Sequence, residues 1–114
     1  MDLMAVELDG VKVVHPVGSM KNENEIVELK GLFKGCKVAK QRNVIFNMED
    51  VEDMSYTGIG VLVQGLRQAR SMGGDVRLAS LDNGLTKSFS CAGALPIFQS
   101  FETESEALRS FAPV

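Results

Sequence analysis

The segment 43–74 constrains the fold of this chain more than any other, because it joins a strand pattern directly to a helix pattern. The apolar run 44–46 is typical of a central strand covered on both faces. Apolar residues then recur at helical spacing through 59–69, and Gly73-Gly74 favours a helix end there. The expected apolar stripe comprises Ile59, Leu62, Val63, Leu66 and Ala69.

Residues 55–60, Ser-Tyr-Thr-Gly-Ile-Gly, bring hydroxyls and glycines together at the point where the predicted strand gives way to the helix. A hydroxyl at a helix N-terminus has two physical uses. It caps free backbone N–H groups, or it lies where a phosphate is held, free or covalent. The function of the chain depends on which of these two uses applies.

The rest of the chain predicts strands and helices in alternation after an antiparallel start. Residues 4–8 and 11–17 are typical of two strands joined by the turn Asp9-Gly10, with Pro16 near a strand end or at a sheet edge. The pattern therefore predicts the α/β class, with a small mixed β-sheet and about four helices packed on it. Further strands are expected at 75–80 and within 95–101, and helices after Asn22, after Ser55 or Thr57, after Asp82 and after Thr103.

The size and composition of the chain predict one domain over residues 1–114. Its 114 residues are 45% hydrophobic, enough for a single core. No apolar run approaches the ~20 residues that a membrane span requires, and residues 1–3 lack the features of a secretion signal. Cys36 and Cys91 lie far apart in helical patterns, so we expect small buried side chains in a reducing compartment. Together these features indicate a cytoplasmic protein.

The charges and the single histidine exclude other classes of partner. A formal net charge of −3 argues against sequence-independent nucleic-acid binding, which requires a surplus of Lys and Arg on one face. His15 lies in a strand pattern without a second ligand nearby, so we interpret it as an ordinary sheet histidine and expect no metal and no cofactor. The acidic segment Glu49–Asp53 is expected to form a solvated turn, or to steer a basic partner toward the chain.

No enzyme signature is found in the sequence. The pair Gly58 and Gly60 lacks the third glycine of a dinucleotide-binding fingerprint, because position 63 is Val. No Gly-Lys-Ser/Thr phosphate loop occurs, and one histidine placed in a strand does not supply a Ser-His-Asp or Cys-His set. We therefore expect a binding protein and not an enzyme.

Residues 51–62, Val-Glu-Asp-Met-Ser-Tyr-Thr-Gly-Ile-Gly-Val-Leu, resemble the signature of the STAS family of anti-sigma-factor antagonists. The usual signature has an acidic residue, two hydroxyl residues, Gly-Leu-Gly and an apolar helix. The resemblance continues through 69–78 and the pattern of 85–108. The order of the predicted strands and helices matches that of the family over residues 4–111, and the sequence motifs themselves are specific over 51–98. The resemblance therefore implies a single STAS-like domain.

The resemblance also implies a partner-switching role. In the family, a serine directly after an Asp is phosphorylated by a partner that is both kinase and anti-sigma factor. The unphosphorylated antagonist binds that partner and releases the sigma factor, and a phosphatase resets the system. Aligned on Gly58 and Gly60, this chain departs from the pattern: Ser55 holds the Asp position, Tyr56 the acceptor position and Thr57 the following hydroxyl position.

Three interpretations of residues 55–57 stay open. In the first, Ser55 or Thr57 only caps the helix, an interaction worth about 1 kcal/mol. In the second, Ser55, Tyr56 or Thr57 is a phospho-acceptor, whose added charge of about −1.5 to −2 faces both the helix N-terminus and the acidic segment. In the third, Tyr56 is a docking aromatic in a domain that binds its partner constitutively.

We favour a protein-binding module that binds an anti-sigma factor of the serine-kinase type, with a phosphatase as a further partner if a hydroxyl is phosphorylated. The alternative is a STAS subunit or scaffold of a transporter or signalling complex, with a different protein or a small ligand as partner. Methionines near the junction are expected either to line an adaptable binding face or to fill the core. The predicted partner-binding residues are Met20, Lys21, Asp53, Met54, Ser55, Tyr56, Thr57, Gly58, Ile59 and Gly60.

Overall fold

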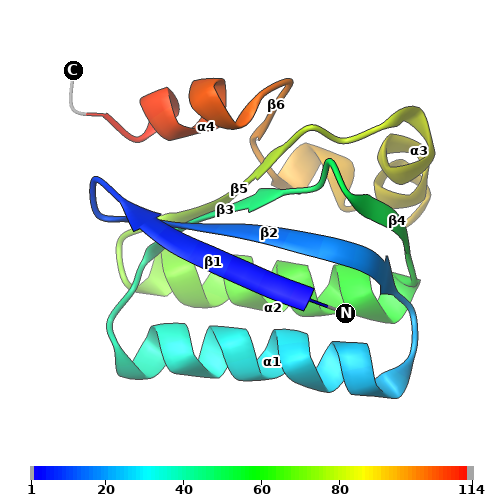
Figure 1. The fold of residues 1–114 in the computed structure, drawn as a ribbon, viewed down its shortest axis with the longest axis horizontal. Helices are drawn as coiled ribbons and strands as arrows, with labels where there is room; N and C mark the ends of the chain where they lie inside the picture. The colour runs from blue at the N-terminus through cyan, green and yellow to red at the C-terminus, as the bar shows by residue number, and fades with distance from the viewer. Residues whose placement is uncertain (1, 113–114) are drawn as a thin grey trace.

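The computed structural model describes residues 2–112 and confirms the predicted α/β class with a mixed sheet (Figure 1). Strands and helices alternate after two opening strands, as the sequence pattern indicates. No helix among these residues is both long enough and apolar enough to cross a membrane. The elements are β1 (Asp2–Leu8), β2 (Val11–Met20), α1 (Glu23–Val38), β3 (Asn43–Asn47), β4 (Val51–Met54), α2 (Tyr56–Ser71), β5 (Asp75–Ala79), α3 (Asn83–Cys91), the 3-10 helix η1 (Leu95–Ile97), β6 (Ser100–Phe101) and α4 (Glu104–Ser110).

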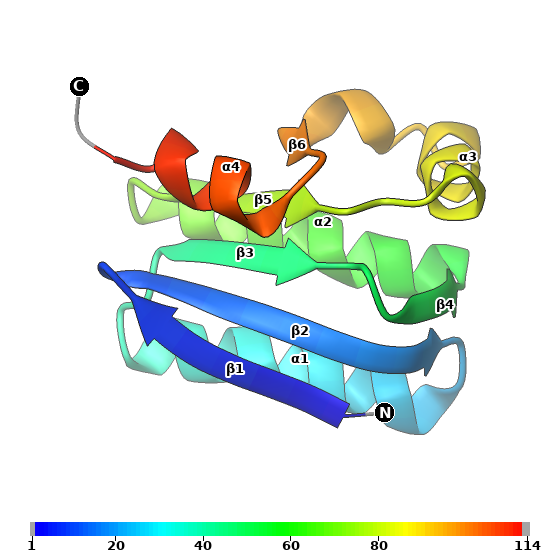
Figure 2. The ribbon, with the colours of Figure 1, turned by 45° about the horizontal axis from the view of Figure 1, so that its top comes forward.

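The sheet runs in the order β1-β2-β3-β5-β6, with β4 also paired to β2. Strand β1 is antiparallel to β2, and every other pair is parallel, which confirms the predicted antiparallel start. Figure 2 shows β1 at one edge of the sheet and β6 at the other. The central strand β3 is the apolar run that the sequence predicts, with Val44, Ile45 and Phe46 all buried.

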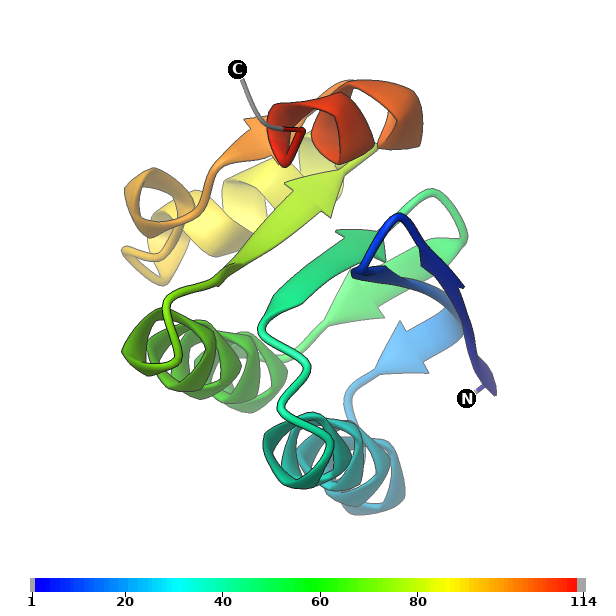
Figure 3. The ribbon, with the colours of Figure 1, turned by 90° about the vertical axis from the view of Figure 1, so that its left-hand side faces the viewer.

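Helices cover the two faces of the sheet unequally (Figure 3). Helices α1, α2 and α3 contribute to the larger core on one face, around Phe46, Leu66 and Phe89. Helix α4 covers part of the opposite face, where Ala107 packs with Val13 and Ile45. The prediction of four helices packed on the sheet is therefore confirmed for the described residues.

Strand β2 pairs with two strands in succession, and this pairing corrects two expectations. It pairs with β3 over Lys12–Val14 and with β4 over Gly18–Met20. Pro16 lies inside β2, opposite Leu3 of β1, and not at a strand end or a sheet edge. On its other side it falls in the gap between these two ladders, where no partner strand requires the N–H that proline lacks.

The acidic segment Glu49–Asp53 is not simply a solvated turn. Residues 51–54 form β4, and only Glu49 and Asp50 make the turn before it. Val51 and Met54 are buried, so pairing with β2 and burial prevail over the low strand propensity of Glu52 and Asp53.

The predicted helix boundaries are largely confirmed. The side chains of Asn22, Asp82 and Thr103 each accept a hydrogen bond from the backbone N–H three residues on. Gly73 and Gly93 follow α2 and α3 with φ of +84° and +72°, a conformation that glycine adopts without a Cβ clash. One expectation is wrong: Cys36 is buried, but Cys91 is exposed because it is the last residue of the short helix α3.

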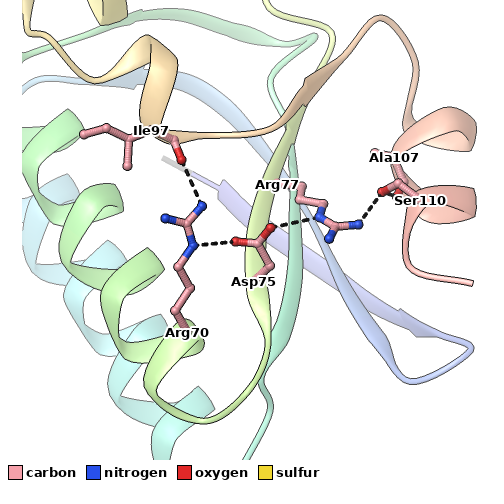
Figure 4. Close-up of polar contacts among 6 residues, drawn as sticks. All are labelled: Arg70, Asp75, Arg77, Ile97, Ala107 and Ser110. Atoms are coloured by element: carbon pink, nitrogen blue, oxygen red, sulfur yellow. Dashed lines mark hydrogen bonds and ion pairs between the residues drawn. The ribbon is translucent and has the colours of Figure 1, made fainter.

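An ion-pair network fixes the C-terminal end of α2 against the sheet (Figure 4). The carboxylate of Asp75 accepts hydrogen bonds from Nε of Arg70 at 3.2 Å and from Nε of Arg77 at 2.9 Å. Arg70 also donates to the carbonyl of Ile97 at 2.9 Å, and Arg77 to Oγ of Ser110 at 2.7 Å. Arg77 points away from the larger core and is covered by the C-terminal residues Ser110 and Phe111. One buried carboxylate thus joins α2, β5 and α4.

The packing of α1 on α2 depends on Gly65, and its replacement by Ala is expected to destabilise the fold. A Cβ at this position would overlap the ring of the buried Phe33. Alanine gains up to about 1 kcal/mol of helix propensity, but overpacking costs ~1–3 kcal/mol, so we expect a net loss of up to about 2 kcal/mol. Denaturant unfolding measures this change.

Gly31→Ala is the matched control, because a Cβ at Gly31 in the middle of α1 has no atom within 4 Å. We expect this variant to be stabilised by up to about 1 kcal/mol. Equal stability of the two variants would contradict the close approach of the helices at Gly65.

Candidate functional site

Ser55 is the residue that joins β4 to α2, and it caps the helix. Its backbone N–H donates to the carbonyl of Met20 at 2.9 Å, and its Oγ accepts from the N–H of Gly58 at 3.1 Å. Of the two cap candidates left open by the sequence, Ser55 is therefore the cap and Thr57 is not. The end of β2 and the start of α2 are held together through this one residue.

The residues that follow the cap present two exposed side chains to solvent. Tyr56, the first residue of α2, is 62% exposed, and Thr57 is exposed beside it. Ser55 is half-buried and Gly60 is exposed. A binding protein or a modifying enzyme would therefore meet Tyr56 and Thr57 first.

Met20 and Met54 are corrected from partner-facing residues to core residues. Met20 is 1% exposed and Met54 is 6% exposed, because they end the paired strands β2 and β4 beneath the first turn of α2. Gly58 and Ile59 are also buried. A Cβ on Gly58 would lie 3.1 Å from the Met20 carbonyl oxygen, so this position leaves little room for a side chain. These four residues support the junction from below instead of contacting a partner.

Lys21 and Asp53 form an ion pair beside the junction, with Nζ 2.7 Å from Oδ2. Both side chains are partly exposed. The hydrogen bond from Lys21 lowers the pKa of the Asp53 carboxyl, and the same contact raises the pKa of the Lys21 amine. Asp53 is paired with Ser19 of β2 in the ladder, so this ion pair links the end of β2 to β4. It places two charged side chains close to the cap, with Asp53 two residues before Ser55.

His15 lies within β2, as predicted, and its Nε2 is 2.8 Å from Oδ2 of Asp50 in the turn before β4. The residues between 2 and 112 hold no group of three or more His, Cys, Asp and Glu side chains that is arranged to bind a metal. Of the acidic segment, Asp50 and Asp53 thus each have a contact with a basic side chain, and Glu52 is exposed.

A groove of about 470 Å³ runs beside Tyr56, between α2 and the segment from the end of α3 to η1. Sequence reasoning missed this groove, because its two walls are some thirty residues apart in the chain. The exposed Arg67 and Gln64 lie among its polar residues, and Val63, expected in the buried stripe, is half-buried here. The lining residues are Tyr56, Ile59, Gly60, Val63, Gln64, Arg67, Cys91, Ala92, Ala94 and Ile97.

The junction and the groove together form a surface suited to docking. The exposed ring of Tyr56 borders a largely apolar groove. The hydroxyls at the N-terminus of α2 and the Lys21–Asp53 ion pair lie close to this residue in the chain. Aromatic and apolar contacts supply most of the affinity of protein interfaces, and a helix N-terminus favours negative charge. These are properties of surfaces that bind a protein segment or a phosphate.

Comparison with known proteins places the fold. A family model described as STAS domain matches residues 2–107. A candidate anti-sigma factor antagonist from Thermotoga maritima, tm1081, is 23% identical over 95% of this chain and 92% of its own, with a TM-score of 0.87.

Two further structures share the fold. The anti-sigma factor antagonist SpoIIAA in its unphosphorylated form is 17% identical, with 98% of this chain and 100% of that chain covered and a TM-score of 0.82. A sulfate transporter family protein from Wolinella succinogenes is also 17% identical, with 92% and 87% covered and a TM-score of 0.73.

Removal of the Ser55 hydroxyl is expected to weaken the fold by about 1 kcal/mol, because Ser55→Ala leaves the N–H of Gly58 without its cap. Thermal unfolding measures the loss. Thr57→Ala is the matched control, since this neighbouring hydroxyl is exposed and does not cap the helix; its effect is expected to stay within about 0.5 kcal/mol. A larger loss in Thr57→Ala than in Ser55→Ala would overturn the assignment of the cap.

Lys21→Gln is expected to move the Asp53 pKa upward, toward its ordinary value, because the ion pair lowers it. A carboxyl whose pKa is lower in the folded state than in the unfolded state stabilises the fold at any pH above its unfolded-state pKa. This stabilisation is lost as the pH falls through the folded-state pKa. The variant should therefore lose less stability on acidification than the wild type. An NMR titration of the Asp53 carboxyl measures the shift, with Lys30→Gln on the exposed side of α1 as control. An Asp53 pKa that is the same in Lys21→Gln as in the wild type would contradict the pairing.

Proposed function

This chain belongs to the STAS domain family, and on that premise we propose that it is a protein-binding module of the anti-sigma-factor antagonist kind and not an enzyme. Its proposed partner is a kinase-type anti-sigma factor, and its proposed place of action is the cytoplasm. Three features support the proposal: the family membership, the antagonists among the proteins of the same fold, and a docking surface at the position of the family's acceptor residue.

The observation that carries the proposal is the exposure of Tyr56. An aromatic side chain that is 62% exposed at the first residue of a helix contributes little to the core. It has few rotatable bonds, a large apolar face and a polar hydroxyl, which are the properties of side chains that dominate binding at interfaces. The adjoining groove gives a partner room to pack against the ring from the side of α3.

The buried residues of the predicted site have a supporting role in this proposal. The first turn of α2 is held in a fixed position on the sheet by the buried residues Met20, Met54, Gly58 and Ile59. A preorganised surface loses less conformational freedom on binding than a mobile one, so rigidity below the junction favours affinity above it.

The hydroxyl groups at the junction differ in their suitability as phospho-acceptors. The Ser55 hydroxyl is half-buried and is occupied as the helix cap, whereas those of Tyr56 and Thr57 lie on exposed residues. A phosphate on Thr57 would meet the favourable N-terminus of α2 but also the nearby carboxylates of Glu52 and Asp53. We propose that binding is constitutive, since Tyr56 occupies the acceptor position. Of the two remaining hydroxyls, that of Thr57 lies on the more exposed residue, so phosphate there is the outcome that would most directly oppose this proposal.

A second function is a role as subunit or scaffold of a transporter complex. The observation in its favour is the shared fold with the sulfate transporter family protein of Wolinella succinogenes. The same docking surface would then receive a different protein. A genome in which this gene lies beside a permease would favour this second function, and one in which it lies beside a sigma factor would favour the first.

Tyr56→Ala is expected to weaken binding to the kinase-type anti-sigma factor of the source genome by about thirtyfold or more, the loss of an interface hot spot. The free energy of unfolding should change little, because the ring is exposed. Isothermal titration calorimetry measures the affinity, and Val27→Ala on α1 is the matched control, since Val27 is 61% exposed.

The same assay with ATP tests the proposed absence of a serine switch. The wild type should keep its affinity, whereas Tyr56→Ser should become phosphorylated at residue 56, as read by mass spectrometry, and dissociate. Equal affinities of Tyr56→Ala and Val27→Ala would contradict the docking role. Loss of wild-type binding on addition of ATP, with phosphate on Ser55 or Thr57, would contradict constitutive binding.

A further inference from the structure

The free edge of β1 is a second interaction surface, separate from the junction at Tyr56. Among the described residues β1 pairs with β2 alone, so its outer edge carries backbone N–H and C=O groups without a neighbouring strand. Figure 2 shows this strand lying along the open side of the sheet. Such an edge is a template for another strand.

The side chains of β1 make the same edge apolar. Met4, Val6 and Leu8 point to the sheet face that α4 only partly covers, and they are 62%, 58% and 41% exposed. Val17 of β2 is on the same face and is 43% exposed. A hollow of about 420 Å³ lies between them, bordered by Met4, Val6, Val13 and His15. Monomeric proteins rarely leave neighbouring large apolar side chains uncovered in this way.

The two edges of the sheet are protected to different degrees. The edge strand β6 has only two residues, which offers little to a further strand. Strand β1 has seven residues, without proline, lysine or a register shift against β2. Short strands, prolines, bulges and charged residues, lysine above all, are the devices by which proteins block pairing at an edge, and of these β1 has only the acidic residues Asp2 and Glu7.

We propose that β1 binds β1 of a second copy of this chain, antiparallel across a two-fold axis, so that the two sheets form one continuous sheet. Opposing residues of an antiparallel pair share a face, and a two-fold centred on Ala5 uses the whole strand. Met4 of one copy then opposes Val6 of the other, and Leu3 opposes Glu7.

The charges on β1 and β2 favour a second copy of this chain as the partner of the β1 edge. The carboxylate of Glu7 does not meet its own counterpart in this register, and within each copy Lys12 of β2 lies directly opposite Glu7. In this register no like charges are directly opposed: the exposed Met4 and Val6 oppose each other, and Leu8 opposes Asp2. A strand of seven residues is only about 24 Å long, so this interface is smaller than that of a permanent dimer, and the association is weak and depends on concentration.

Sedimentation equilibrium over a concentration series into the sub-millimolar range, with the wild-type chain alone, tests the proposal. The mean mass should rise from that of a monomer toward that of a dimer. Val6→Lys should raise the dissociation constant at least about tenfold, because it places a charged, strongly hydrated side chain on the paired edge. Val27→Lys is the matched control, because Val27 is an equally exposed valine on α1, and it should leave the constant unchanged.

Amide chemical shifts recorded over the same concentrations locate the contact, and circular dichroism shows that each variant is folded. The shifts should move along residues 3–8 and stay fixed at residues 55–60. A mass that stays monomeric throughout would overturn the proposal, as would a dimer that Val6→Lys leaves intact or one whose shifts lie outside β1. The test involves no anti-sigma factor, so its outcome is independent of the proposed function.

Discussion

The succession of two parallel ladders along β2 is the constraint on which the rest of the structure depends. Because β3 pairs with the first half of β2 and β4 with its last residues, the chain has to turn between them and then enter α2 directly beside Met20. The hydrogen bond from Ser55 to the Met20 carbonyl completes this pairing. The start of α2 is thereby fixed relative to the centre of the sheet, and the two residues after the cap are left pointing to solvent.

Helix α2 is held at both ends by polar contacts and along its length by packing. The Ser55 cap fixes its start, the Asp75 network with Arg70 fixes its end, and Gly65 allows Phe33 of α1 to approach between them. Since stability comes from these buried contacts, the exposed Tyr56 and Thr57 at the helix N-terminus contribute little to holding the fold. This separation is consistent with a role for the exposed Tyr56 in binding and not in the core.

Local signals in the sequence were sufficient for the elements but not for the contacts between them. The caps at Asn22 and Asp82 and the glycine after α2 were predicted because each depends only on residues a few positions away. Strand β4 was missed because its acidic residues favour a turn, and only pairing with β2 makes it a strand. The burial of Met20 and Met54, the exposure of Cys91 and the groove beside Tyr56 depend on segments distant in the chain, so no local pattern reports them.

The central claim is that the α2 N-terminus is a contact point for another protein, and the chain offers a direct probe of it. Tyr56 is its only tyrosine, so labelling with 3-fluorotyrosine gives a single ¹⁹F resonance from the junction. Titration with the kinase-type anti-sigma factor should shift or broaden this resonance until one partner is bound per chain. A complex that forms, as judged by its mass, while the resonance keeps its position and width would contradict the account.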